Sequence, residues 1–291
     1  MDIKKVFIVG AGLMGSGIAQ VCAQSGINVV LNDISKEAID KGLKDIAWSV
    51  SKFIEKGKLT EDKGTILNRI STDDDFSGGA DVDLVIEAVF EKLELKQEIF
   101  RRLDEVCRQN TILASNTSAI PITELASVTR RPEKVLGIHF FSPVPMMPVA
   151  EVIRGIGTTE ETIFVGVDFV KGIGKEPIRV ESDVAGFLLN RINFPSTIEA
   201  IRLVEQGIGT VEDIDKGMRL AFGRRMGPFE TGDMVGLDVT YGALMACYEE
   251  TKDSRFYPPQ LLRRKVKAGH LGRKTGKGWY EYNEDGTRKA G

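Results

Sequence analysis

A glycine-rich turn near the N-terminus constrains the fold of this chain more than any other segment. It reads Gly10-Ala11-Gly12-Leu13-Met14-Gly15 and follows the apolar run Val6–Val9. Glycines at this spacing bind dinucleotide phosphates when a buried strand precedes them and a helix follows. Gly10 permits the tight turn, Gly12 lets a pyrophosphate approach the backbone, and Gly15 lets helix and strand pack closely. The segment therefore predicts the first unit of a dinucleotide-binding domain.

The residues that flank this turn indicate which dinucleotide binds. Leu13 and Met14 open the predicted helix, whose N-terminal N–H groups favour a phosphate. Asp33 closes the second predicted strand, Asn28–Leu31, 18 residues after Gly15. A carboxylate there can bind the adenosine ribose hydroxyls, and it would repel the 2′-phosphate of NADP. We therefore expect NAD as the cofactor; the alternative is an ordinary turn with a solvated aspartate.

Short apolar runs alternate with amphipathic segments through the first 184 residues. The predicted strands are Val6–Val9, Asn28–Leu31, Asp83–Glu87, Thr111–Ala114, Val135–Phe141, Val149–Ile153 and Pro177–Val180. The predicted helices are Gly15–Ser25, Lys36–Lys56, a short helix capped by Thr60, Leu93–Val106 and Thr159–Ile173. This alternation is typical of a Rossmann-type, doubly wound α/β sheet that is mainly parallel.

The strand pattern stops near residue 185, and helix-like segments follow. They are Phe187–Glu205, Val211–Leu220 and Pro228–Tyr248. We therefore expect two domains, an NAD-binding Rossmann domain over residues 1–184 and an all-α C-terminal domain over residues 185–291. The length of the chain, 291 residues, suits two domains.

Composition narrows the class of protein. The formal net charge of −3 gives no general basic field for nucleic acid, so no nucleic-acid partner is expected. The three cysteines, an odd number at wide spacings, indicate reduced thiols rather than a disulfide framework. No apolar stretch approaches the ~20 residues of a membrane span, and the N-terminus has no signal-peptide pattern. We expect a cytoplasmic protein with no membrane partner.

A histidine is the expected base for removing a hydroxyl proton, because its pKa lies near neutrality. The chain has two, His139 and His270. His270 lies in a segment rich in lysine and arginine, which would lower its pKa and offers no carboxylate to orient it. His139 closes a predicted strand, where active sites of α/β proteins form, and is our candidate. A buried histidine with a purely structural role is the alternative.

Three polar residues could surround His139. Glu151 begins the next apolar run, and a proline-rich loop could bring it beside the imidazole; a surface position on a strand is the alternative. Ser118 ends a polar cluster that follows a predicted strand, and this cluster could equally be a turn. Asn190 lies within an apolar helical start, where an amide needs a partner.

These segments together resemble the (S)-3-hydroxyacyl-CoA dehydrogenases, particularly bacterial 3-hydroxybutyryl-CoA dehydrogenases. The similarity runs nearly from end to end of the chain. The stretches that carry it are Val6–Gly12, Ser115–Ser118, His139-Phe140-Phe141, Gly186-Phe187 with Asn190-Arg191, Met226-Gly227-Pro228 and Gly272–Gly278. The resemblance implies oxidation of an acyl-CoA 3-hydroxyl by NAD, and a homodimer that pairs through the helical domain.

The resemblance also implies roles for individual residues. His139 is the catalytic base paired with Glu151, and Ser118 and Asn190 bind the oxygens of the substrate. Residues implied at the cofactor are Glu91, Lys96, Ser118 and Ser142. Lys52 and Lys56 look like contacts for the phosphates of CoA, although a pair four residues apart on a helix is more often a solvated face.

Two positions depart from the family pattern. Ser142 stands where the family usually has asparagine, and Pro148 stands in a segment that usually holds lysine. The first changes local hydrogen bonding near the cofactor and substrate. The second fixes φ and removes a backbone donor. Two other functions fit the same plan: a dehydrogenase of a free hydroxy acid or sugar acid, and an NAD-binding protein without catalysis.

Overall fold

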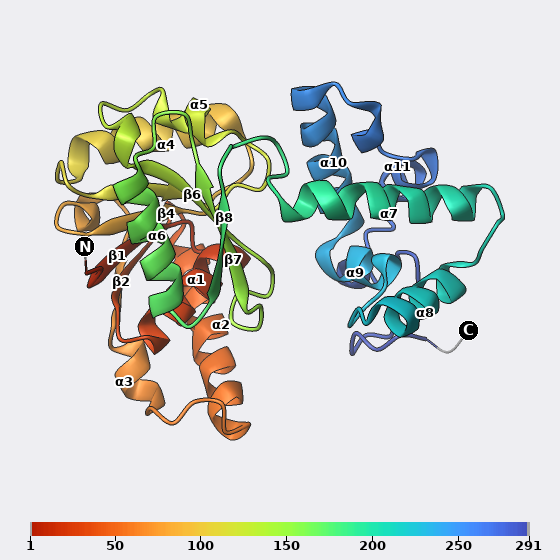
Figure 1. Cartoon of the computed structure of the whole chain (residues 1–291). Coiled ribbons are helices and arrows are strands. Elements are labelled where there is room, and N and C mark those ends of the chain that lie inside the picture. Colours follow the sequence, from red (N-terminus) through yellow and green to blue (C-terminus); the bar gives the residue numbers. More distant parts are fainter. Residues whose placement is uncertain (1, 290–291) are drawn as a thin grey trace. The chain divides into compact units, whose positions relative to one another are not determined.

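The computed structural model describes residues 2–289 and divides into two compact units. The first unit ends at Val184 and the second begins at Ala185. Figure 1 shows a sheet flanked by helices in the first unit and a set of helices in the second. Among the described residues, no helix is both long enough and apolar enough to cross a membrane.

The first unit is built on one sheet. Its strands are β1 (Lys5–Val9), β2 (Asn28–Asn32), β3 (Ile70–Asp73), β4 (Leu84–Glu87), β5 (Ile112–Ser115), β6 (Val135–Phe140), β7 (Val149–Arg154) and β8 (Glu176–Val180). They lie in the order β3-β2-β1-β4-β5-β6-β7-β8, and only the β6–β7 pair is antiparallel among the described strands. The predicted doubly wound, mainly parallel sheet is confirmed.

Helices cover this sheet and bury its apolar residues. They are α1 (Leu13–Gln24), α2 (Lys36–Glu55), α3 (Lys63–Leu67), α4 (Leu93–Val106), α5 (Ile122–Ala126) and α6 (Glu160–Gly172). Val6 and Ile8 of β1 join one core cluster with residues of α1, α2 and α6. Phe7, between them, contacts the ring of Phe76, at 6.0 Å between centroids. Successive residues of a strand point to opposite faces, so β1 is buried on both sides.

Two local features of the first unit differ from expectation. Strand β3 is absent from the predicted set because its sequence, Ile70–Asp73, holds a single apolar residue. In the structure its residues are exposed or half-buried. It joins the edge of the sheet through backbone pairing with β2, which no side-chain pattern reveals. The predicted cap Thr60 is also wrong: Asp62 caps α3 and accepts a hydrogen bond from the N–H of Thr65 at 3.1 Å.

The second unit is helical, with α7 (Leu189–Glu205), α8 (Val211–Phe222), α9 (Pro228–Val235), α10 (Leu237–Thr251) and α11 (Gln260–Lys267). The continuous helix predicted over Pro228–Tyr248 is wrong, because Gly236 adopts φ +110° and separates α9 from α10. A few isolated β-bridges hold the C-terminal segment, for example Gly272 to Lys277. Residues of α7, α9, α10 and α11 share one core cluster with Tyr280 and Tyr282.

The three cysteines, Cys22, Cys107 and Cys247, are free and buried. Burial raises the pKa of the Cys22 thiol to about 12, and it raises the pKa values of Cys107 and Cys247 to about 11. Because the thiolate is the reactive form, we expect iodoacetamide at about pH 8 to leave the native chain unlabelled. Mass spectrometry should find three labels only after unfolding in urea. Equally fast labelling of native and unfolded chains would contradict this expectation.

Candidate active site

The glycine-rich turn after β1 leaves an open approach to its backbone. Gly10 has φ +106°, and a Cβ there would lie 2.7 Å from the carbonyl oxygen of Ala88. A Cβ at Gly15 would lie 1.7 Å from the carbonyl oxygen of Gly10, so α1 can approach the turn only with glycine. A Cβ at Gly12 would meet no described atom within 4 Å. The turn is therefore tight on two sides and open at Gly12.

The N-terminus of α1 faces this opening with its N–H groups uncapped. Gly12 is the N-cap residue, and within the described chain no side chain caps it and no acidic residue lies in the first turn. Leu13 is 75 % exposed. Because the first N–H groups of a helix have no partner within it, they can donate to a pyrophosphate. These residues fit a dinucleotide.

Asp33, directly after β2, lies beside the same turn. One carboxylate oxygen accepts a hydrogen bond from the N–H of Ala11 at 2.9 Å, and the other accepts one from Ser35 at 2.9 Å. These two bonds fix the carboxylate next to the glycine-rich turn. The arrangement agrees with the position in which a ribose would be bound.

His139 and Glu151 form a buried pair on neighbouring strands. The antiparallel register of β6 and β7 sets the two residues directly opposite each other. The Nδ1 atom of His139 lies 2.8 Å from a carboxylate oxygen of Glu151, and the two residues are 4 % and 0 % exposed. Glu151 is the third residue of β7 rather than its first, and its burial excludes a surface position.

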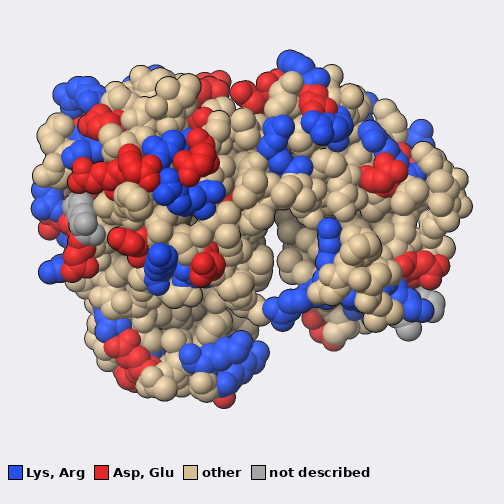
Figure 2. All heavy atoms as spheres, viewed as in Figure 1, with Lys and Arg blue, Asp and Glu red and all other residues tan. Residues whose placement is uncertain are grey.

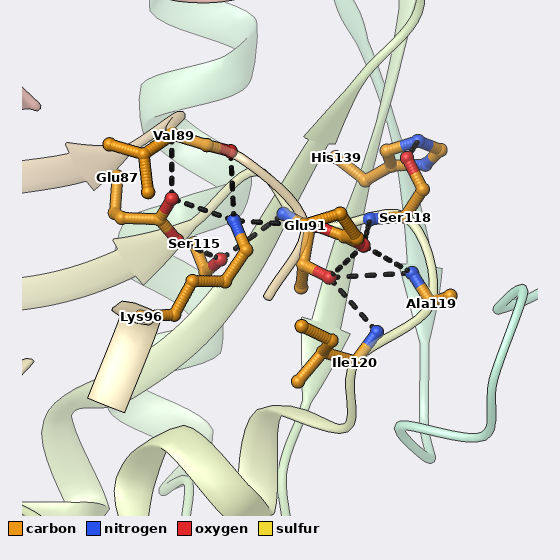
Figure 3. Close-up of polar contacts among 10 residues, drawn as sticks. Glu87, Val89, Glu91, Lys96, Ser115, Ser118, Ala119, Ile120 and His139 are labelled. Carbon is orange, nitrogen blue, oxygen red and sulfur yellow. Dashed lines mark hydrogen bonds and ion pairs between the residues drawn. The ribbon is translucent and has the colours of Figure 1, made fainter. Parts of the chain in front are cut away.

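Ser118 lies on the other side of the imidazole. Its hydroxyl oxygen is 3.2 Å from Nε2 of His139, and Figure 3 shows the two side chains pointing toward each other. The predicted polar cluster, which follows β5, also contacts the strand of His139, because the side-chain oxygen of Asn116 accepts a hydrogen bond from the N–H of Phe140 on β6 at 2.9 Å. One ring nitrogen of His139 therefore faces a carboxylate and the other faces a hydroxyl.

Glu91 holds the loop that carries Ser118. One of its carboxylate oxygens accepts hydrogen bonds from the hydroxyl of Thr117 at 2.6 Å and from the N–H groups of Ser118 at 2.8 Å and Ala119 at 3.0 Å (Figure 3). Partial burial raises the pKa of Glu91, but nearby Lys96 and these three donors outweigh it and hold the pKa below its ordinary value. The carboxylate form is therefore favoured.

Lys96, which contacts Glu91, also forms a buried ion pair with Glu87. The ammonium group of Lys96 lies 2.7 Å from Glu87 and 3.3 Å from Glu91, and the side chains of Lys96 and Glu87 are 1 % and 0 % exposed. Glu87 also accepts hydrogen bonds from the hydroxyl of Ser115 at 2.6 Å and the N–H of Val89 at 2.7 Å. Glu87 was not among the residues predicted for the site. Its position at the end of the apolar strand β4 could have indicated it, because a carboxylate there needs a buried partner.

Four other expected site residues have less defined surroundings. Ser142 is half-buried and follows Phe141, whose ring centroid lies 4.6 Å from that of His139. Lys52 pairs with Glu55 at 2.7 Å, and Lys56 is exposed where α2 ends. Figure 2 shows basic side chains gathered at that end of α2. The fourth, in the second unit, is Asn190, which is half-buried near the start of α7.

The two units match the two halves of one enzyme family. Residues 5–184 match the family model described as 3-hydroxyacyl-CoA dehydrogenase, NAD binding domain. Residues 186–282 match the model for the C-terminal domain of the same family. The chain belongs to the 3-hydroxyacyl-CoA dehydrogenase family. The predicted family, the NAD cofactor and the enzyme class, an NAD-dependent dehydrogenase, are therefore confirmed.

Individual relatives resemble the chain over almost their whole length. A protein of Bacillus subtilis named probable 3-hydroxybutyryl-CoA dehydrogenase is 43 % identical over 285 residues, which cover 98 % of this chain and 99 % of the relative. The mitochondrial hydroxyacyl-coenzyme A dehydrogenase of Mus musculus is 43 % identical over 289 residues, covering 96 % and 91 %. The crystal structure of (S)-3-hydroxybutyryl-CoA dehydrogenase from Ralstonia eutropha has a TM-score of 0.91 at 43 % identity, covering 97 % and 100 %.

Proposed function

We propose that this enzyme oxidises the hydroxyl group of (S)-3-hydroxybutyryl-CoA with NAD and catalyses the reverse reduction of acetoacetyl-CoA. The observation that carries the proposal is the buried imidazole of His139, which lies between the carboxylate of Glu151 and the hydroxyl of Ser118. The family supplies the reaction class, and the names of the bacterial relatives support a four-carbon acyl chain.

The pair of His139 and Glu151 suits proton transfer. The Nδ1–H group of His139 donates to Glu151, which leaves the lone pair of Nε2 to take the proton of the 3-hydroxyl. Glu151 then stabilises the positive imidazolium, as carboxylates do in other histidine-based sites. A bound NAD would supply the acceptor for the hydride of C3. In the reverse direction His139 returns the proton to the forming hydroxyl.

The remaining residues have proposed binding roles. Ser118, with its hydroxyl 3.2 Å from the base, orients the reacting oxygen of the substrate. Asn190 is assigned a hydrogen bond to the substrate, and Lys52 and Lys56 are assigned the CoA phosphates. On the cofactor side we assign the glycine-rich turn, Leu13, Met14, Asp33, Glu91, Lys96, Ser118 and Ser142.

The oxidation of NADH tests the proposal with three classes of acceptor: acetoacetyl-CoA, longer 3-oxoacyl-CoA thioesters and free acetoacetate. We expect kcat/KM to be highest with acetoacetyl-CoA and turnover to be negligible with the free acid. Turnover of free hydroxy or oxo acids alone would favour the alternative dehydrogenase. Binding of NAD without turnover of any acceptor would favour a protein that has lost catalysis.

Cofactor preference should follow from Asp33. Like charges about 4 Å apart near a protein surface repel by about 4 kcal/mol, so we expect NADH to exceed NADPH in kcat/KM by at least about tenfold. Asp33→Asn should narrow this preference, because the amide carries no negative charge. The exposed Asp40, on α2, provides the control Asp40→Asn, which should leave the preference unchanged. A parent enzyme that prefers NADPH would contradict the role of Asp33.

We also propose a homodimer that forms through the helical unit. Leu220 and Phe222, at the end of α8, are 77 % and 74 % exposed, and large exposed apolar side chains often mark a protein interface. Light scattering should give about twice the chain mass of 32.0 kDa. Phe222→Glu should shift the mass toward the monomer, whereas Trp48→Glu, at a 66 % exposed position on α2, should not. A monomeric parent would contradict the proposal.

The proposed location is the cytoplasm. The three cysteines are free and buried, and unpaired thiols are typical of proteins in a reducing compartment. Fractionation of the native cells, followed by the dehydrogenase assay, would test this location.

A further inference from the structure

A pocket of about 230 Å³ lies within the helical unit, among side chains that the proposed reaction does not use. We call it the arginine pocket, and its lining residues are Arg219, Arg225, Met226, Glu230, Arg273, Tyr280, Tyr282 and Arg288. They come from α8, the α8–α9 connection, α9 and the C-terminal segment. All belong to the second unit, so the arrangement of the pocket is set by that unit alone.

Two buried tyrosines line the arginine pocket, and buried aspartates anchor them. The hydroxyl of Tyr280 donates to Asp215 at 2.7 Å, and that of Tyr282 donates to Asp233 at 2.9 Å. Asp215 also accepts two backbone N–H groups at the start of α9, and Asp233 accepts those of Trp279 and Tyr280. Neutral donors therefore satisfy both aspartates, and the tyrosine rings form a rigid lining.

Two of the arginines lie over these rings. The guanidinium carbon of Arg288 is 3.5 Å from the ring centroid of Tyr280, and that of Arg273 is 5.6 Å from the centroid of Tyr282. A guanidinium that lies over an aromatic ring still has its N–H groups in its own plane, where they can donate to oxygen atoms. The two stacked arginines are thus held in place without using all of their donors.

The side chains that line the arginine pocket carry more positive than negative charge. Arg219 pairs with Glu230, and Arg288 lies 3.4 Å from Glu212. Arg225 is exposed and forms no ion pair or side-chain hydrogen bond with any residue in the range 2–289. The lining itself therefore holds four guanidinium groups and one carboxylate, that of Glu230, whereas Asp215 and Asp233 anchor the tyrosines and are not lining residues. An anion with several oxygen atoms could accept hydrogen bonds from the guanidinium groups that have no carboxylate partner among the described residues.

From these contacts we propose that the arginine pocket binds the phosphate groups of a small phosphorylated molecule. Arginine binds phosphate oxygens through paired N–H donors, and four arginines from separate segments suit a phosphate better than a carboxylate with two oxygens. The volume is smaller than the roughly 300–1,000 Å³ of pockets that enclose a whole drug-sized ligand. The charged end of the ligand therefore enters the pocket, and the remainder lies outside.

Calorimetry with inorganic pyrophosphate, on the full chain saturated with NADH, tests this proposal. We expect measurable binding, a clear rise in Kd for Arg225→Gln, and a rise of at least about tenfold for the variant Arg225→Gln/Arg273→Gln, since each change removes charge-assisted hydrogen bonds. The matched control is Arg263→Gln, an exposed arginine on α11 of the same unit, which should leave Kd unchanged. Thermal unfolding of each variant checks that it is folded.

Competition experiments distinguish two sources of the phosphate. Displacement of pyrophosphate by CoA, but not by 3′-dephospho-CoA, would identify the 3′-phosphate of a CoA; displacement by ADP alone would identify a free nucleotide. Either result supports the proposal if Arg225→Gln also weakens the binding of the molecule that displaces pyrophosphate. Absence of pyrophosphate binding, or equal Kd values for Arg225→Gln and Arg263→Gln, would overturn it. Because binding is measured rather than turnover, such a failure leaves the proposed dehydrogenase activity standing.

Discussion

Replacing His139 with glutamine should reduce kcat for acetoacetyl-CoA reduction by about 10²–10⁴-fold, the usual contribution of a general acid or base. Glutamine approximates the length of the imidazole and keeps polar atoms, but it cannot exchange a proton near neutral pH. The affinity for NADH should be nearly unchanged, because the glycine-rich turn and Asp33 follow β1 and β2, whereas His139 lies on β6. Steady-state kinetics and NADH fluorescence titration would separate the two effects.

The other histidine of the chain provides the control. His270 is half-buried in the helical unit, and His270→Gln should keep kcat within about twofold of the parent. Glu151→Gln should also reduce kcat, since the amide cannot stabilise an imidazolium as a carboxylate does. If His139→Gln turned over at a rate near that of the parent, the proposed base would be wrong.

Replacing Glu87 with leucine should lower the free energy of unfolding by about 3–5 kcal/mol, the cost of leaving one member of a buried ion pair without its partner. The ammonium of Lys96 is buried, and it would keep Glu91, at 3.3 Å, and the carbonyl oxygen of Val89, at 3.4 Å, in place of its short contact with Glu87. The hydroxyl of Ser115 would lose its acceptor as well. Urea unfolding monitored by circular dichroism would measure the change.

Two further variants identify the cause of this effect. Glu87→Leu/Lys96→Met removes both charges and should recover much of the loss, because apolar residues often replace a buried ion pair without a cost. Asp81→Asn disrupts the exposed pair of Lys5 and Asp81, whose atoms are 2.6 Å apart, and should change stability by only about 0–1 kcal/mol. A double variant no more stable than Glu87→Leu would indicate that packing, and not the uncompensated charge, sets the effect.

Several features of the molecule followed from local sequence. The glycine-rich turn, the strand before it and the helix after it are neighbours along the chain, so spacing alone predicted the nucleotide-binding unit and its cofactor. His139 could be preferred to His270 because His139 lies at the end of an apolar strand, whereas His270 lies among lysine and arginine residues. The apolar periodicity of a strand or helix is contained within that one segment of sequence. The alternation of strand and helix segments then predicts the fold class.

Other features depended on contacts between distant segments. The register of β6 and β7 decided that Glu151 faces His139, and the sheet order decided that Ser115 meets Glu87. Backbone pairing created β3 at the edge, and a positive φ at Gly236 divided a helix that the apolar periodicity left continuous. The arginine pocket likewise gathers residues from 219 to 288. Local propensity cannot reveal such arrangements, because their stability comes from packing and hydrogen bonds between segments far apart along the chain.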